Sequence, residues 1–280
     1  MTIPRTQILE RLHKQADLGR PIVGCGAGTG LSAKMAEAGG ADLIIIYNSG
    51  RFRMAGRGSL AGLMPYGDAN GVVVEMAAEV LTIVEDTPVL AGICGTDPFR
   101  LMAVFLPELA RLGFSGVQNF PTVGLIDGDF RANLEATGMG YALEVDAVRA
   151  AHQLDLFTSP YVFDAASAIA MAEAGADLLV CHVGLTTSGS IGAGVALSLD
   201  AAIQRVQEMV AAARTVRGDI LAICHGGPFD EPDNVGIALT RMPEVAGFFG
   251  ASSIERLPTE RAVKAQVESF KQLPLGRLEA

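Results

Sequence analysis

Short apolar runs alternate with amphipathic stretches along the whole chain, and this alternation predicts a regular succession of strands and helices. The clearest run, from Leu178 to Val183, is broken only by His182 and is typical of a strand buried on both faces. A loop rich in glycine, serine and threonine follows it, and then a long amphipathic helix from about Ser198 to Arg217. Seven further segments have the pattern of a buried strand: Pro21–Gly28, Ala41–Asn48, Pro88–Gly95, Gly116–Phe120, Leu156–Phe163, Ile220–His225 and Gly247–Ala251.

Helical stretches separate these predicted strands. After an amphipathic segment at the amino terminus, we expect helices at Gly30–Ala38, Val72–Val84, Phe99–Leu112, Glu144–Gln153, Ala165–Ala174, Asn234–Leu239 and Pro258–Gln272. Eight strands that alternate with helices predict an α/β protein, and specifically a (β/α)8 TIM barrel with an N-terminal helix. We expect residues 1–280 to form a single TIM-barrel domain. The alternative is a doubly wound sheet, which would place the site at one switch point instead of a ring of loops.

The stretch from Ser49 to Asn70 is the least regular part of the sequence. It is long for a loop inside a compact domain, so we expect it to have a function. Arg51, Arg53 and Arg57 lie in it, and guanidinium groups suit carboxylate or phosphate. One such arginine alone is more typical of a solvated surface charge. We expect the loop to fold over the mouth of the barrel, with Arg53 or a neighbour closing on a bound anion.

Composition narrows the classes of function. Half of the residues are hydrophobic and 19% are charged, which allows a large core. The formal net charge of −10 argues against nonspecific nucleic-acid binding, which needs a basic surface. No apolar run approaches the roughly 20 residues of a membrane span, so we expect no membrane partner. The four cysteines have no CxxC spacing and fall within predicted strands, as is typical of buried thiols in a reducing compartment, and we expect a cytoplasmic protein.

Two histidines lie at the ends of neighbouring predicted strands. His182 and His225 each follow a cysteine, Cys181 or Cys224. Successive side chains of a strand point to opposite faces, so one residue of each pair faces the barrel axis. If both histidines point inward, their imidazoles can meet and serve as acid/base groups or as ligands of a soft metal. The alternative for each is a hydrogen-bonded core histidine, and their matching positions favour catalysis.

Polar residues follow other predicted strands, and we expect them at one mouth because parallel strands share one carboxyl end. Asn119 is a third catalytic candidate, since Pro121 follows and no helix begins there for Asn119 to cap. Four residues at the end of the second strand are assigned to substrate binding: Asn48, Ser49, Gly50 and Arg53. Loop amides at Ser49 and Gly50 can hold an anion, and the arginines follow at once, whereas the alternative for this pair is simple turn chemistry.

The last two strands end in small residues. Gly226 and Gly227, together with Ser252 and Ser253, lie where barrels commonly bind phosphate, and we assign them to substrate binding. For Ser252 the alternative is a helix capping box with Glu255.

Several segments resemble a known enzyme superfamily. LSAKMAEAGGADLIIIYNSG, residues 31–50, and PVLAGICGTD, residues 88–97, resemble the phosphoenolpyruvate mutase and isocitrate lyase superfamily. Within it the chain is more similar to the phosphoenolpyruvate hydrolase-like family, in YNSGRFRMAGRGSLAGLMPYGDAN, residues 47–70, GVQNFPTVGLIDGDFRANLEATGMG, residues 116–140, and GFFGASSIERLP, residues 247–258. The resemblance implies a barrel of the phosphoenolpyruvate/pyruvate-domain type and a hydrolase or lyase. Its substrate would be a small anionic oxo-acid, like phosphonopyruvate or phosphoenolpyruvate, cleaved at a P–C, P–O or C–C bond.

The resemblance is incomplete where the superfamily binds Mg²⁺. Its members carry two aspartates on the third strand, as in ADAD, where this chain reads AGIC from Ala91 to Cys94. At their Glu-Asp pair on the fourth strand it reads Gln118 and Asn119. Magnesium needs carboxylate oxygens, so the cofactor stays unknown. The missing acids favour an alternative function, a catalytically silent barrel that binds a small anion as a sensor or regulatory module, whereas the histidines favour an enzyme.

The final predicted helix carries an apolar stripe. Val263, Val267 and Phe270 recur at helical spacing. Superfamily relatives often assemble through their last helices, so the resemblance implies a homo-oligomer. The alternative is that the stripe covers the last and first strands of its own barrel.

Overall fold

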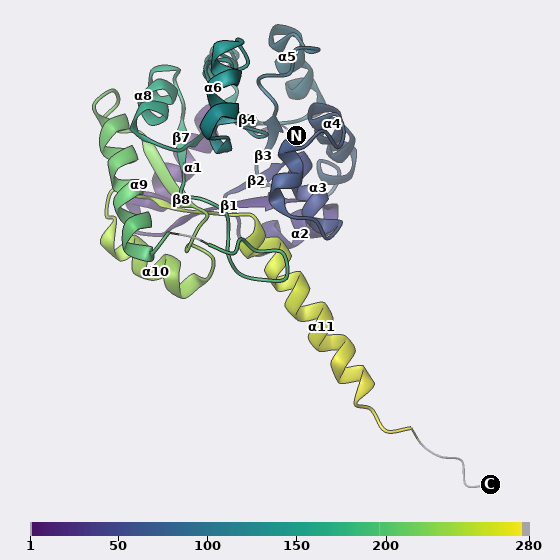
Figure 1. Cartoon of the computed structure of the whole chain (residues 1–280). Coiled ribbons are helices and arrows are strands. Elements are labelled where there is room, and N and C mark those ends of the chain that lie inside the picture. The colour runs from purple at the N-terminus through teal and green to yellow at the C-terminus, as the bar shows by residue number, and fades with distance from the viewer. Residues whose placement is uncertain (1, 196, 276–280) are drawn as a thin grey trace, which may run out of the picture.

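The computed structural model describes residues 2–195 and 197–275, and it is an α/β barrel (Figure 1). Its strands are β1 (Ile22–Ala27), β2 (Leu43–Ile46), β3 (Val89–Ile93), β4 (Gly116–Asn119), β5 (Phe157–Thr158), β6 (Tyr161–Val162), β7 (Leu178–His182), β8 (Leu221–His225) and β9 (Gly247–Gly250). The α-helices are α1 (Arg5–Asp17), α2 (Gly30–Ala38), α3 (Asn48–Met54), α4 (Ala69–Val80), α5 (Met102–Leu112), α6 (Gly128–Ala136), α7 (Ala142–Gln153), α8 (Ala165–Glu173), α9 (Leu199–Arg214), α10 (Pro232–Arg241) and α11 (Leu257–Lys271). Three short turns complete the chain: η1 (Ser59–Leu63), η2 (Val123–Leu125) and the π-helical η3 (Ser252–Arg256).

The parallel sheet closes through a broken strand. Neighbouring strands follow the order β5-β4-β3-β2-β1-β9-β8-β7-β6. The two end members, β5 and β6, are halves of one stretch, residues 157–162, which therefore stands between β4 and β7 and returns the sheet on itself. Pro160 lies between the halves and cannot donate to a ladder. The predicted TIM barrel is confirmed.

The strands form the core because almost all of their residues are apolar and buried. All four residues of β2, Leu43–Ile46, are buried, as expected for a strand covered on both faces. The surrounding helices turn apolar residues at helical spacing towards the sheet, as α4 does with Val73, Met76 and Val80. In the described part of the chain, no helix combines the length and the apolarity needed to cross a membrane.

The stretch from Ser49 to Asn70 is more regular than its sequence predicts. It contains most of α3 and all of η1, and the second strand ends at Ile46 because α3 begins at Asn48. The chain leaves α3 at Gly56, whose φ is 77°. A helix of seven residues is too short to reveal an apolar periodicity, and the prediction of an irregular loop was therefore wrong.

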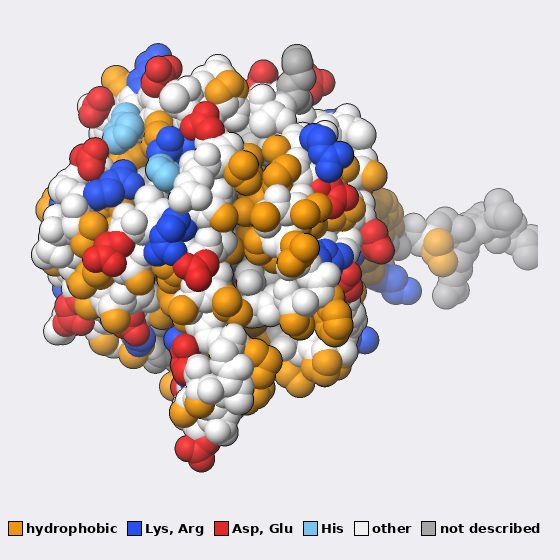
Figure 2. Space-filling model, turned by 90° about the horizontal axis from the view of Figure 1, so that it is seen from above, with side chains coloured by type: hydrophobic (Ala, Val, Ile, Leu, Met, Phe, Trp, Pro, Cys, Tyr) orange, Lys and Arg blue, Asp and Glu red, His pale blue; other side chains and the backbone are white. Residues whose placement is uncertain are grey.

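The last helix, α11, extends away from the barrel (Figure 1). Only Leu257, at its first position, is buried, whereas Val263, Val267 and Phe270 are 60%, 56% and 64% exposed. The idea that this stripe covers the first and last strands of its own barrel is therefore wrong. Figure 2 also shows acidic and basic side chains interspersed on one face of the barrel.

We predict that Gly247→Ala destabilises the barrel. Gly247 begins β9 directly beside β1, and a Cβ atom there would overlap the backbone of Ile22. The substitution should lower the free energy of unfolding by about 1–3 kcal/mol, the usual cost of overpacking. The control is Gly236→Ala on α10, where a Cβ would meet nothing within 4 Å and should stabilise by about 0.5–1 kcal/mol. Urea denaturation measures both, and equal stabilities would contradict the close approach of β1 and β9.

Candidate active site at the mouth of the barrel

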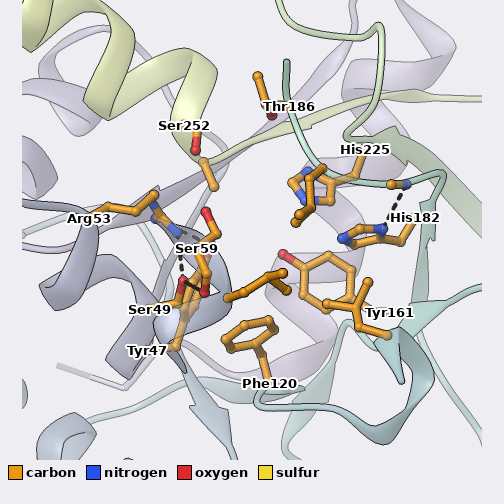
Figure 3. Close-up of a pocket in the computed structure, with 15 residues that line it drawn as sticks. Tyr47, Ser49, Arg53, Ser59, Phe120, Tyr161, His182, Thr186, His225 and Ser252 are labelled. Atoms are coloured by element: carbon orange, nitrogen blue, oxygen red, sulfur yellow. Dashed lines mark hydrogen bonds between the residues drawn. The ribbon is translucent and has the colours of Figure 1, made fainter. Parts of the chain in front are cut away.

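A small cavity of about 30 Å³ lies at the carboxyl ends of the strands (Figure 3). Residues from nearly every part of the barrel line it: Tyr47, Ser49, Arg53, Ser59, Leu60, Phe120, Leu125, Tyr161, His182, Gly184, Leu185, Thr186, His225, Ala251 and Ser252. The lining mixes aromatic and aliphatic walls with a few polar groups, as in most small-molecule sites.

Tyr161 stands at the centre of the aromatic wall. It is the first residue of β6, directly after the break in the strand, and is almost fully buried. Its ring centroid lies 5.2 Å from that of His182, 5.1 Å from that of His225 and 5.9 Å from that of Phe249. The two histidine side chains are therefore fixed by packing as well as by hydrogen bonds.

The backbone fixes opposite tautomers in the two histidines, which are register partners on β7 and β8 with ring centroids 4.8 Å apart. His182 Nδ1 accepts a hydrogen bond from the Gly184 N–H at 3.1 Å, so the proton of the neutral ring is on Nε2. His225 Nδ1 lies 2.8 Å from the Phe249 carbonyl oxygen, which can only accept, so Nδ1 carries the proton and Nε2 a lone pair. The pair offers one N–H donor and one basic nitrogen.

Burial keeps both imidazoles neutral at pH 7. It lowers the pKa of His225 to about 4, with a hydrogen bond to the Phe249 carbonyl opposing the shift and Arg53 adding to it. Burial also lowers the pKa of His182 well below its usual range, and His225 and Arg205 contribute in the same direction. His225 is therefore available as a base across the physiological pH range.

A buried arginine, Arg53 of α3, forms the opposite wall and is 3% exposed. Its Nη1 donates to Ser49 Oγ at 3.2 Å, and its Nη2 lies 3.5 Å from both Tyr47 Oη and Glu255 Oε2. Its Nε has no hydrogen-bond partner among the described residues. Burial opposes its charge, but Tyr47 and Glu255 together raise the pKa of the guanidinium, so it stays cationic. A buried cation with long bonds and an unused N–H group is suited to bind an anion.

Glu255 reaches Arg53 from η3. Its Oε1 accepts hydrogen bonds from the Gly28 N–H and the Ser32 hydroxyl. The capping box considered for Ser252 and Glu255 is therefore not formed, because η3 runs directly into α11 and the carboxylate turns back towards the barrel. Burial raises the pKa of Glu255, and the Arg53 charge opposes that shift.

Five of the predicted site residues meet at this cavity: His182, His225, Ser49, Arg53 and Ser252. Five others lie outside its lining. Asn48 donates to the Gly62 carbonyl at 2.9 Å and lines a neighbouring pocket, while Gly50 packs its backbone against Ala27. Gly226 and Gly227 shape a turn in which the Gly227 N–H donates to the Gly184 carbonyl at 2.9 Å, and Ser253 borders a groove near α10.

The eleventh predicted residue, Asn119, bonds to the backbone of the broken strand. Its Oδ1 accepts from the Tyr161 N–H at 2.7 Å, and its Nδ2 donates to the Tyr161 carbonyl at 3.4 Å and to Glu144 at 2.7 Å. The side chain thus bridges β4 and β6 where Pro160 interrupts the ladder. It lies outside the lining of the cavity. This geometry makes Asn119 a residue that positions Tyr161.

The chain is similar to known sequences over most of its length. A sequence profile of the family described as phosphoenolpyruvate hydrolase-like matches residues 7–273. The chain belongs to this family. It is 57% identical over 271 residues to the ToMV resistance protein Tm-1(GCR237) of Solanum lycopersicum, and 56% identical to the ToMV susceptible protein tm-1(GCR26) of the same plant. Each alignment covers 97% of this chain but 36% of the relative, so the chain spans about a third of those proteins.

Solved structures share the fold of this phosphoenolpyruvate hydrolase-like barrel. A 2,3-dimethylmalate lyase aligns with a TM-score of 0.59 and 18% identity, over 100% of this chain and 91% of that chain. A phosphonopyruvate hydrolase in complex with oxalate and Mg²⁺ aligns with a TM-score of 0.56 and 17% identity, over 98% and 92% of the two chains.

The residues of this phosphoenolpyruvate hydrolase-like chain do not fit the magnesium site that the resemblance to the phosphoenolpyruvate mutase and isocitrate lyase superfamily implies. At Gly92, in the position of the first aspartate of the ADAD motif, a Cβ atom would overlap Tyr47 Cβ. On β4, Gln118 donates to the Ser159 carbonyl at 3.0 Å, and Asn119 is bonded to Tyr161. Within the described residues, no group of three or more His, Cys, Asp or Glu side chains could hold a metal ion.

The sequence analysis did not assign Tyr47, Tyr161 or Glu255 to the site, although these residues contact the two histidines or Arg53. For Tyr47 the sequence contains one indication, namely the glycines Gly26 and Gly92, which make room for its side chain on the strands either side of β2. For Tyr161 and Glu255 the sequence contains no such indication. The position of the Tyr161 side chain depends on the break in its strand, and that of Glu255 depends on the turn η3.

We predict that Asn119→Ala weakens the closure of the barrel. It would leave the buried Tyr161 N–H without its partner, and an unsatisfied buried group costs about 1–3 kcal/mol. The control is Asn133→Ala on the exposed side of α6, which should change stability by less than about 0.5 kcal/mol. Chemical denaturation compares the two variants. Equal stabilities would show that the Asn119 amide is not needed for closure.

Proposed function

We propose that this barrel is a hydrolase or lyase for a small anionic oxo-acid of the phosphonopyruvate or phosphoenolpyruvate kind. The observation that carries the proposal is the neutral pair His182 and His225, fixed in opposite tautomers across a cavity from the buried Arg53. Membership of the phosphoenolpyruvate hydrolase-like family supports the same substrate class. The bond that is cleaved, P–C, P–O or C–C, follows from which substrate reacts.

Each polar group has a role in this proposal. Arg53, with Ser49 beside it, binds the carboxylate or the phosphonate of the substrate. His225 Nε2 accepts a proton from the attacking water or from a substrate hydroxyl. His182 Nε2–H donates a hydrogen bond to the oxygen on which negative charge develops. The aliphatic side chains of Leu60, Leu125 and Leu185 keep bulk water from the reacting atoms.

The alternative is an anion-binding barrel without turnover that acts as a sensor or regulatory module. Two observations favour it. The cavity, about 30 Å³, is small for an oxo-acid and a water together, and the superfamily's acidic positions are not retained. The tomato relatives are also named for resistance and susceptibility to a virus and not for a reaction.

Turnover by the purified protein tests the proposal. We expect one member of a panel of phosphonopyruvate, phosphoenolpyruvate and oxaloacetate to be consumed. The variant His225→Gln should be slower by about 10²–10⁴-fold, the usual contribution of a general base. Because the pKa of His225 is lowered to about 4, its basic form persists as the pH falls, so the acid limb of the rate profile should lie near pH 4.

The matched control is His13→Gln on α1, which is exposed and should react at the wild-type rate. An acid limb near the ordinary histidine pKa of about 6.5 would contradict the role given to His225. Binding of an anion without any product across the panel would favour the sensor.

We also propose that the protein is a homo-oligomer assembled through α11. The stripe on this helix is exposed, and an apolar groove lies open between α10 and the outer face of β1 and β9. Its apolar lining comprises Pro21, Val23, Pro232, Val235, Leu239, Phe248 and Ile254. The α11 stripe of a second copy is the proposed occupant, because α11 departs from η3 at the edge of this groove without covering it.

A charge on the apolar stripe should dissociate this assembly. We expect multi-angle light scattering to give an oligomer for the wild-type protein and a monomer for Val267→Glu. The control is Ala265→Glu, which adds the same charge to the opposite side of the exposed helix and should stay oligomeric. A monomeric wild-type protein would reject the proposal.

A further inference from the structure

We infer that the guanidinium of Arg53 supplies, in this barrel, the positive charge that Mg²⁺ supplies in the superfamily, so that anion binding needs no divalent metal. The inference deepens the proposed function, since it concerns the same site. It rests on the positions of Tyr47 and Arg53 at the mouth. It also rests on Gln118 and Asn119 of β4, whose side-chain amides bond to the backbone of the broken strand.

Tyr47 fills the space that a metal-binding carboxylate at residue 92 would need. A Cβ at residue 92 would lie only 2.4 Å from Tyr47 Cβ, and a Cβ at residue 26 would lie 2.7 Å from the Tyr47 hydroxyl. The ring therefore crosses the interior from β3 to β1, and both strands carry glycine at the crossing. In the arrangement seen here, a side chain at residue 92 would therefore overlap Tyr47.

The tyrosine leads directly to the arginine. Its hydroxyl lies 3.5 Å from Arg53 Nη2, and the Arg53 Cζ lies 5.3 Å from the ring centroid. Electron-rich aromatic faces and phenol oxygens stabilise a cation. The chain thus replaces an acidic group, which would attract a metal ion, with a group that supports a fixed cation.

One carboxylate, Glu255, partly balances the charge of Arg53. Its Oε2 lies 3.5 Å from Arg53 Nη2, while its Oε1 is held by Gly28 and Ser32. Among residues 2–195 and 197–275, neither Glu255 Oε2 nor Arg53 Nε has a hydrogen-bond partner. The ion pair is therefore loose, and an anion in the cavity can approach the guanidinium without displacing a tight salt bridge.

A guanidinium and a metal ion recognise anions differently. Arginine presents parallel N–H groups to the two oxygens of one carboxylate or phosphonate. Magnesium instead takes oxygen ligands in an octahedral arrangement, which favours a chelating ligand such as oxalate. Binding through Arg53 should therefore extend to inorganic phosphate, and neither anion should need a metal.

Calorimetric titration of the full chain with oxalate and with inorganic phosphate tests the inference. We expect the same dissociation constant in excess EDTA and in excess Mg²⁺. Arg53→Met should weaken binding of both anions by at least about tenfold, because a charged hydrogen bond is lost. Arg53→Lys keeps the positive charge but lacks the parallel N–H donors of the guanidinium, so it should bind both anions with intermediate affinity. This second variant still tests the inference if Arg53→Met does not fold.

The control is Arg51→Met, since Arg51 lies on the same helix but forms a half-exposed pair with Glu79 at 2.7 Å. It should bind both anions like the wild type. Binding that appears only with Mg²⁺, binding that survives in Arg53→Met, or no binding of either anion would each overturn the inference. Metal-independent binding through Arg53 without turnover would uphold it while rejecting the proposed reaction, and metal-dependent turnover would do the reverse.

Discussion

The buried charge of Arg53 is the constraint on which the mouth of this barrel depends. A guanidinium removed from water is costly unless polar groups surround it. Tyr47 and Ser49 approach it from the start of α3, directly after β2, and Glu255 approaches it from η3. Glu255 lies in the π-helical turn η3, and the Gly28 N–H and the Ser32 hydroxyl hold its carboxylate in place. The contacts of Arg53 and Glu255 thereby connect the beginnings of α2 and α3 to η3, which leads into α11.

A second constraint acts on the other side of the cavity, where the broken strand must still close the sheet. Pro160 removes a backbone donor between β5 and β6, and the side chains of Gln118 and Asn119 bond to the backbone on either side of it. The break lets the chain turn Tyr161 into the interior, where its ring packs against both histidines. The irregular strand therefore positions the histidines as well as closing the barrel.

These two constraints explain which features the sequence could reveal. Buried strands such as Leu43–Ile46 depend on composition alone, so the strand pattern predicted the barrel. The meeting of His182 and His225 could be predicted because equal positions at the ends of adjacent parallel strands give equal orientation. The hydrogen bonds of Asn119 to the Tyr161 backbone could not be predicted. A polar residue at the end of a strand gives the same sequence pattern whether its side chain faces a cavity or a neighbouring backbone. Likewise, the glycines at 226 and 227 serve the turn that holds Gly184, and only the tertiary fold reveals this.

The departures from the superfamily at β3 belong together with the arginine. Glycine at residue 92 removes a possible metal ligand, and the space it leaves is filled by Tyr47. Tyr47 in turn contacts Arg53, whose charge has the sign of the ion for which the ligand is missing. Considered alone, Gly92 and Tyr47 each indicate only that a metal site has been lost. Taken as one contact chain from β3 to α3, they give the cavity an electropositive wall opposite the two neutral imidazoles.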